Sequence, residues 1–274
     1  MQIAIQGEPG SFSHEAALRL VPEATILHCP FSPEVFERVA SGDADAAVIP
    51  IENSLAGSVV EHYDLLLTHD VAVERETLLG IHHNLIVVPG TTLDRLHRVY
   101  SHPIALAQCR KFFAQNPHIE PVPYYDTAGS VKQMMELRDR SCGAIASAQA
   151  AACYGGEVLA PNLEDAAENY TRFFFIRRRG QVPPNPEADK VSLAFHVENR
   201  PGTLVGALQS FASQEVNLTK IESRPVHGRP WQYVFYTDYQ LASPAAADRA
   251  LELLARHCSM VKELGRYKAG RIEE

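Results

Sequence analysis

The chain of 274 residues carries 25 Lys and Arg against 33 Asp and Glu, a net charge of −8 with His neutral. This acidic balance argues against a nucleic-acid-binding face, and a content of 46% hydrophobic and 21% charged residues is typical of globular rather than disordered or fibrous chains. Five widely spaced cysteines without a CxxC pair favour reduced thiols and a cytoplasmic location. No apolar stretch approaches the roughly 18–20 residues of a membrane span, and the N-terminus is typical of a strand rather than a signal peptide.

The first 180 residues alternate short apolar strands with helical stripes. Strands are expected at residues 3–6, 46–51, 84–88, 143–146 and 173–177. Helical spacing joins Phe12 to Leu20, Val59 to Leu67 and Ala105 to Phe113. Ser32-Pro33 is expected to cap a further helix that Gly42 closes. This alternation predicts α/β layers around a mostly parallel sheet.

Three prolines within residues 180–186 predict a linker, placed at 181–189, before a second domain at 190–270. That domain is expected to contain strands at 191–197, 217–225, 231–239 and 260–267. Helical stripes run from Leu204 to Ala212 and from Ala247 to Cys258, and His227-Gly228-Arg229 signals a hairpin. The resulting order βαββαβ is the ferredoxin-like pattern.

In the first domain, several expected strands end in loops rich in Gly, Ser, Thr and Asn, and a helix follows at once. The loops are residues 7–13, 52–58, 126–130 and 146–147. Ligands of open α/β sheets bind at such carboxyl ends, where helix N-termini offer free N–H groups to anions. Ordinary N-capping explains any single loop, but the repetition favours a small-anion site.

The familiar signatures of cofactor and metal sites are absent from the sequence. Gly7-x-x-Gly10 lacks the dinucleotide spacing, no P-loop or nucleophile elbow occurs, and none of the histidines has zinc-ligand spacing. The pair Thr171-Arg172 precedes an apolar run, where it is either a polar strand cap or part of a binding site. Arg177-Arg178-Arg179 leaves the same two alternatives open, and its place before the linker favours a solvated strand end.

The first domain resembles prephenate dehydratases over its whole length. The segments that carry the resemblance are Gly7-Glu-Pro-Gly-Ser-Phe-Ser13, Val48-Ile-Pro-Ile-Glu-Asn-Ser54 with Gly57-Ser58, Ser101-His-Pro103 with Ala107-Gln-Cys109, Asp126-Thr-Ala-Gly129 and Thr171-Arg-Phe173. The second domain resembles the ACT regulatory module, through Asn199-Arg-Pro-Gly-Thr-Leu-Val205 and Glu222-Ser-Arg-Pro225. No chorismate mutase segment precedes residue 1, so a monofunctional chain is expected.

The resemblance implies a two-lobed catalytic domain at residues 1–180, like a type II periplasmic-binding protein. One lobe would comprise about 1–80 and 160–180, and the other about 81–159. The implied reaction is the decarboxylating dehydration of prephenate to phenylpyruvate in phenylalanine biosynthesis, by a carbon–oxygen lyase without metal or organic cofactor. Arogenate dehydratase and a non-catalytic amino-acid or solute sensor remain alternatives.

The resemblance also implies roles for individual residues. Thr171 would donate a hydrogen bond to the departing hydroxide, with Glu52 and His83 tuning or relaying the proton and Arg172 as a cation. Substrate binding is expected at Ser11, Ser13, Asn53, Ser54, Thr127, Ser147 and Phe173.

For the second domain, the resemblance implies feedback regulation by phenylalanine. The effector would bind at Asn199, Pro201, Gly202, Thr203, Leu204, Val205, Glu222, Ser223, Arg224 and Pro225. Pairing of two such modules would cover their exposed sheet edge, so a homodimer or a homotetramer is expected.

Overall fold

The structure is a computed structural model that describes residues 1–226 and 228–272; of the hairpin signal, His227 lies outside the described residues. The chain forms two compact units. The first consists mainly of Met1–His62 and Thr77–Phe175, and the second of Tyr63–Glu76 and Ile176–Gly270. Within the described ranges, no helix is long and apolar enough to cross a bilayer.

The first sheet has the strand order β2-β1-β3-β11-β5, and β4 pairs with β3. Its strands are β1 (Gln2–Gln6), β2 (Thr25–Cys29), β3 (Ala46–Asn53), β4 (Gly57–Ser58), β5 (Val71–Gly80) and β11 (Tyr170–Arg178). β1 pairs in parallel with both β2 and β3. Ile3 and Ile5 of β1 are fully buried against Ala16 and Ala17 of α1 (Phe12–Leu20), because alternate side chains of a strand share one face.

Helix α2 (Ser32–Ser41) ends at Gly42, whose φ of +92° is the left-handed conformation that the sequence predicts for a closing glycine. The prediction that Ser32 caps this helix was wrong by one residue. Phe31 occupies the cap position without a side-chain bond, because the Ser32 hydroxyl donates to Gln6 instead. Helix α3 (Val60–Thr68) follows β4.

The second sheet has the order β10-β6-β9-β7-β8. Its strands are β6 (Asn84–Val87), β7 (Arg98–Ser101), β8 (Glu120–Pro123), β9 (Cys142–Ala146) and β10 (Glu157–Ala160). β7 is parallel to β8 and β9, whereas β6 is antiparallel to β9 and β10. The expectation of a mostly parallel sheet therefore fails here: the sheet is mixed, because β6 runs antiparallel to both of its neighbours.

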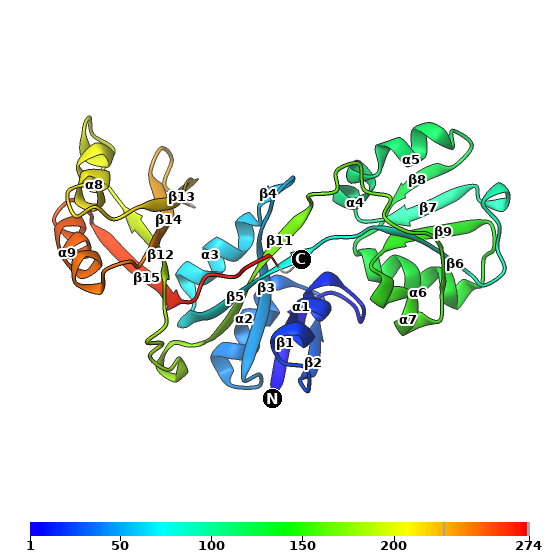
Figure 1. Cartoon of the computed structure of the whole chain (residues 1–274), viewed down its shortest axis with the longest axis horizontal. Helices are drawn as coiled ribbons and strands as arrows, with labels where there is room; N and C mark the ends of the chain where they lie inside the picture. The colour runs from blue at the N-terminus through cyan, green and yellow to red at the C-terminus, as the bar shows by residue number, and fades with distance from the viewer. Residues whose placement is uncertain (227, 273–274) are drawn as a thin grey trace. The chain divides into compact units, whose positions relative to one another are not determined.

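Helices cover both faces of the second sheet (Figure 1). Helices α6 (Thr127–Leu137) and α7 (Ala148–Tyr154) pack on one face, and α4 (Pro103–Gln108) and α5 (Arg110–Gln115) on the other. The single helical stripe expected from Ala105 to Phe113 is two short helices, which break at Cys109 (φ −118°, ψ 33°). The two-lobed α/β fold class is confirmed.

The second unit contains a four-stranded sheet of order β13-β14-β12-β15. Its elements are β12 (Lys190–His196), α8 (Thr203–Ala212), β13 (Leu218–Pro225), β14 (Tyr233–Gln240), α9 (Pro244–Ala255) and β15 (Met260–Tyr267). The predicted βαββαβ order is confirmed. Leu193, Phe195, Phe211 and Leu254 form the centre of its core.

Residues 63–76 belong to the second unit, although they lie within the range expected for the first lobe. Lys262 of β15 explains the association, since its ammonium donates to the carbonyl oxygens of Leu66, Leu67 and His69 at 2.8–2.9 Å. These carbonyls end α3, where a cation is favoured by the helix dipole. The Tyr236 hydroxyl also donates to the Tyr63 carbonyl, at 3.1 Å.

Candidate active site

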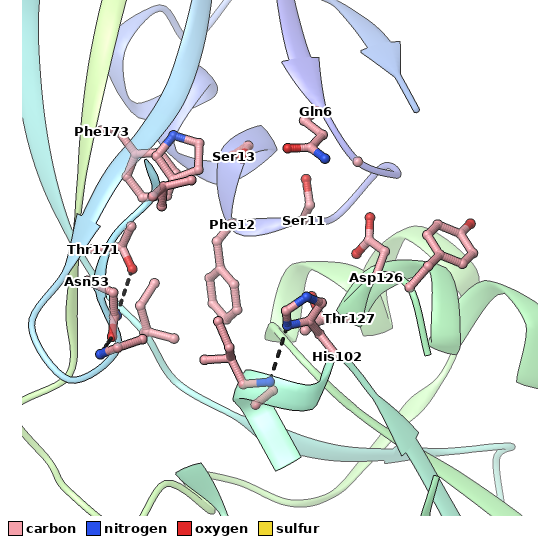
Figure 2. Close-up of a pocket in the computed structure, with 18 of the residues that line it drawn as sticks. Gln6, Ser11, Phe12, Ser13, Asn53, His102, Asp126, Thr127, Thr171 and Phe173 are labelled. Atoms are coloured by element: carbon pink, nitrogen blue, oxygen red, sulfur yellow. Dashed lines mark hydrogen bonds between the residues drawn. The ribbon is translucent and has the colours of Figure 1, made fainter. Parts of the chain in front are cut away.

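A cavity of about 950 Å³ lies within the first unit, among elements of both of its sheets. Residues 6–13 line it from the end of β1 and the start of α1, and Asn53, Thr171 and Phe173 from β3 and β11. From the other sheet come His83, His102, Gln108 and residues 125–127. Figure 2 shows Asn53 and Thr171 joined by a hydrogen bond, with Ser11, Phe12 and Thr127 also around the cavity.

The orientation of the Asn53 amide is fixed by the backbone. The N–H groups of Leu55 and Ala56 can only donate, so the atom that they meet at 3.1 and 2.8 Å is the acceptor Oδ1. Nδ2 of Asn53 therefore faces β11, where it lies 2.8 Å from Oδ1 of Asn169 and 3.0 Å from Oγ1 of Thr171.

Two further side-chain amides donate and accept in a fixed direction as well. Nδ2 of Asn169 donates to Oε1 of Gln108 at 3.0 Å, and Nε2 of Gln108 donates to Oδ1 of Asn53 at 3.3 Å. Since Oε1 of Gln108 can only accept, Nε2 of His83, 2.8 Å away, must carry a hydrogen. Burial lowers the pKa of His83, only partly offset by its bond to Gln108 and by Glu164, so the ring is neutral near pH 7.

Hydrogen bonds consequently run in one direction from His83 through Gln108 and Asn53 to Thr171. Because Oγ1 of Thr171 accepts from Asn53, the threonine's own hydrogen remains available to a ligand in the cavity. Bonds aligned head to tail polarise one another, which strengthens the last donor. Thr171 is thus a preorganised hydrogen-bond donor, 8% exposed, at the cavity wall.

Two helix N-termini also meet the cavity. Ser11 caps α1 and accepts from the His14 N–H, so its hydroxyl hydrogen is directed elsewhere, while Ser13 lies in the first turn. Thr127 begins α6 behind its cap Asp126. The positive dipole ends of two helices favour carboxylates on this side of the cavity, and at α6 the N–H of Ala128 already donates to the Asp126 carboxylate.

Four residues expected at the site do not line the cavity. Glu52 and Arg172 lie 3.7 Å apart, and the Arg172 guanidinium stacks 4.6 Å from the ring centre of Phe174. Ser54 bonds to the backbone of Glu168 and Tyr170. Ser147 caps α7 and donates to the Gly10 carbonyl at 2.6 Å, which joins the β1–α1 loop to the second sheet's helices.

The structure adds residues to which the sequence analysis gave no role. Gln108 and Asn169 belong to the hydrogen-bonded chain of side chains around Asn53 and Thr171, and Gln6 and His102 line the cavity. A signal for Asn169 exists in the sequence, because Asn169, Thr171 and Phe173 share one face of an extended chain and Arg172 points to the other. Among residues 1–226 and 228–272, no group of three or more His, Cys, Asp or Glu side chains could hold a metal ion.

The candidate effector segments lie in the second unit. Gly202 precedes α8 with a φ of +85°, and the Thr203 hydroxyl lies 2.6 Å from the Glu198 carbonyl. Asn199 donates to the Trp231 carbonyl at 3.2 Å. On β13, Glu222 pairs with Lys220 at 3.3 Å and Arg224 with Asp64 at 3.6 Å.

The remaining effector candidates differ in exposure. Leu204 packs against the core of the unit, Val205 is exposed, and Pro201, Ser223 and Pro225 are exposed as well. These segments therefore lie largely at the surface of the unit.

Comparison with known proteins shows the family of the chain. The family profile described as prephenate dehydratase matches residues 3–181. The chain belongs to the prephenate dehydratase family. It is 35% identical to arogenate dehydratase/prephenate dehydratase 2 of Arabidopsis thaliana, over 97% of this chain and 72% of that protein. The assignment as a carbon–oxygen lyase is thereby confirmed.

Solved structures agree over nearly the whole chain. The prephenate dehydratase from Arthrobacter aurescens, solved with L-Phe, has a TM-score of 0.90 at 34% identity and covers 98% of this chain and 90% of its own. A protein described as GqqA, a quorum quenching acylase, has a TM-score of 0.89 at 35% identity and covers 98% of both chains.

Proposed function

We propose that this dehydratase converts prephenate into phenylpyruvate in the cavity of the first unit, with Thr171 as the hydrogen-bond donor to the leaving hydroxyl. The observation that carries the proposal is the fixed orientation of Asn53, which leaves the Thr171 hydrogen free for a ligand.

The reaction breaks two bonds of the substrate. The ring carboxylate leaves as CO₂, and its bonding electrons enter the ring while the C4–O bond breaks. One proton taken from solvent turns the departing hydroxide into water, so prephenate dianion and H⁺ give phenylpyruvate anion, CO₂ and water. Aromatisation drives the reaction, and catalysis requires only that the developing hydroxide be stabilised, which a preorganised donor supplies.

The substrate carboxylates would be held at the N-termini of α1 and α6, by Ser11, Ser13 and Thr127. Phe173, Phe12 and Ile81 supply an apolar wall for the ring. An apolar surrounding favours loss of CO₂, because a carboxylate loses its hydration as it becomes neutral CO₂.

The test is turnover of purified protein with prephenate, followed by the enol absorbance of phenylpyruvate in alkali. A higher kcat/KM with arogenate than with prephenate would make arogenate the principal substrate. Binding of prephenate without formation of product would instead indicate a non-catalytic sensor. Turnover of an amide substrate would test the acylase activity that is named for one structural neighbour.

We further propose that the second unit is an ACT module through which phenylalanine regulates this reaction, supported by the L-Phe in the Arthrobacter aurescens relative. The amino acid's carboxylate would meet the N-terminus of α8, next to Gly202, and its ammonium the carbonyls around Asn199.

Edge strand β13 supports a homodimer, since its backbone edge is unpaired within the sheet and Ile221 is 47% exposed on it. Light scattering at micromolar concentration tests this, and Ile221→Asp should shift the protein toward the monomer. A wild-type monomer with and without phenylalanine would contradict the proposal.

The five unpaired cysteines support a location in a reducing compartment such as the cytoplasm, which cell fractionation tests.

A further inference from the structure

A second polar chain, separate from the one that ends on Thr171, reaches the cavity from the side of α3. His62 is 1% exposed, and its Nδ1 lies 2.5 Å from the Pro50 carbonyl oxygen. Its Nε2 lies 3.0 Å from the Ser32 hydroxyl, which in turn donates to Oε1 of Gln6 at 2.9 Å. Gln6 lines the cavity at the end of β1, and Figure 2 shows its amide together with Ser11.

The hydrogen positions along these side chains follow from which atoms can only accept a hydrogen bond. The Pro50 carbonyl can only accept, so Nδ1 of His62 carries a hydrogen. Ser32 has one hydroxyl hydrogen, and it is used on Oε1 of Gln6. The Ser32 oxygen must therefore accept from Nε2 of His62, which requires a hydrogen there too. This arrangement of Gln6 belongs to the imidazolium form of His62.

The neutral form of His62 demands the opposite polarity. Nε2 then accepts from Ser32, and the Ser32 oxygen can be satisfied only by a donor. The Gln6 amide must turn so that Nε2 donates to Ser32 and Oε1 is presented to the cavity. Protonation of His62 thus exchanges an acceptor for a pair of N–H donors at the cavity wall.

We propose that Gln6 is a specificity-determining residue for a substrate carboxylate, and that His62, acting through Ser32, takes up a proton when that carboxylate binds. The inference rests on the proposed function for the identity of the substrate. A carboxylate can only accept, so it favours the orientation with the Gln6 N–H groups outward, beside the Ser11 hydroxyl and the N-terminus of α1. His62 and Ser32 are positioning residues, since only Gln6 meets the ligand.

The surroundings of His62 make the uptake possible near neutral pH. Burial lowers the pKa of His62, and the bond to Pro50 and the charge of Glu61 act in the opposite direction. The neighbouring elements contribute groups that do not titrate, namely Ser32 and Phe36 of α2 and the Pro50 carbonyl of β3. Burial thus favours the neutral ring, whereas an anion next to Gln6 favours the charged ring, whose hydrogen-bond arrangement is the one that the structure contains.

The first experiment measures KM for prephenate between pH 5.5 and 8.5. Binding coupled to one proton predicts that KM rises with pH, by up to about tenfold per pH unit, above the pKa of free His62. Ser32→Ala should remove this rise and leave kcat nearly unchanged. Gln6→Met alters the proposed carboxylate contact itself, so for that variant only the slope of KM with pH is compared, and the slope should be lost as well. Ser41→Ala, at the exposed end of the same helix, is the matched control that retains it. An equal rise of KM in the wild type and both variants would overturn the proposal.

The second experiment needs no substrate, so it remains decisive even if prephenate is not turned over. NMR titration of the His62 ring gives its pKa in Gln6→Glu and in the double variant Ser32→Ala/Gln6→Glu, each against its parent with Gln6. The relay predicts a larger rise in pKa with Ser32 present, because a carboxylate at position 6 forces Ser32 to accept from His62. The same rise in both backgrounds would show that only direct charge acts, and the relay would be wrong.

Discussion

The two candidate ligand sites of this chain are built in different ways. Around Thr171, partly buried amides satisfy one another and fix the direction of each hydrogen bond before any ligand is present. Around the candidate effector segments, apolar side chains are left at the surface, with Val205 68% and Ile221 47% exposed. A site that performs chemistry needs preorganised donors, whereas a regulatory site can be completed by a ligand and a second copy. The two sites should therefore respond differently to substitution.

Removal of the Thr171 hydroxyl should have the largest effect. Thr171→Ala is expected to lower kcat by about 10²–10⁴-fold, because the leaving hydroxide loses its positioned donor. Thr171→Ser keeps the hydroxyl and should be milder. Thr77→Ala removes an equally buried hydroxyl on β5, away from the cavity, and serves as the control. Retention of more than half of the wild-type kcat by Thr171→Ala would contradict the donor role.

Replacement of the Asn53 amide by a carboxylate should have the next largest effect on kcat. Asn53→Asp keeps an acceptor for the N–H groups of Leu55 and Ala56 but has no hydrogen for Thr171, which must then donate to the new carboxylate. We expect kcat to fall by about 10²-fold, with a smaller change in KM. Steady-state kinetics and a thermal melt of the same preparation separate this effect from unfolding. A variant that is folded and fully active would show that the direction of the chain is irrelevant.

The second unit should show the opposite pattern. Glu222→Ala and Asn199→Ala are expected to leave kcat without effector near the wild-type value and to abolish inhibition by phenylalanine. A coupling free energy of about 1–3 kcal/mol corresponds to roughly 5–150-fold modulation of activity by phenylalanine, and the variants should lose modulation of this size. Glu252→Ala, on the exposed face of α9, is the control. Undiminished inhibition in both variants would place the effector elsewhere.

Local sequence patterns predicted much of the fold but not the cavity's polar chain. The order of the second unit followed from alternating strands and two helical stripes, since each element buries its own face. The antiparallel pairing of β6 and β10 was missed because Glu157–Ala160 is short and its partner lies about seventy residues earlier in the chain. Register of that kind depends on tertiary contacts that no local pattern records.

The same reason explains which site residues were found. Asn53 ends β3, Ser11 lies in the loop after β1, and Thr171 lies near the start of β11. All three stand in motifs that border loops, which local sequence patterns can predict. Gln108 ends a short helix and meets Asn53 and His83, both at least 25 residues away in sequence, so its role emerges only from packing. Arg172 was expected at the site because the resemblance at Thr171-Arg-Phe173 implied a cation there, although the two-residue period of a strand places it on the face opposite to Thr171.

Arg172→Lys should therefore have the smallest effect on catalysis, and it distinguishes the two faces of β11. Lysine can keep a charge near Glu52 but cannot stack a planar guanidinium on Phe174, which should cost about 1–2 kcal/mol of stability. For a chain of this size, that lowers Tm by roughly 2–8 °C. If Arg172 acts only behind the cavity wall, KM for prephenate stays constant while Tm falls. A rise in KM with an unchanged Tm would instead give Arg172 the carboxylate-binding role, because an ammonium cannot replace the two parallel donors of a guanidinium.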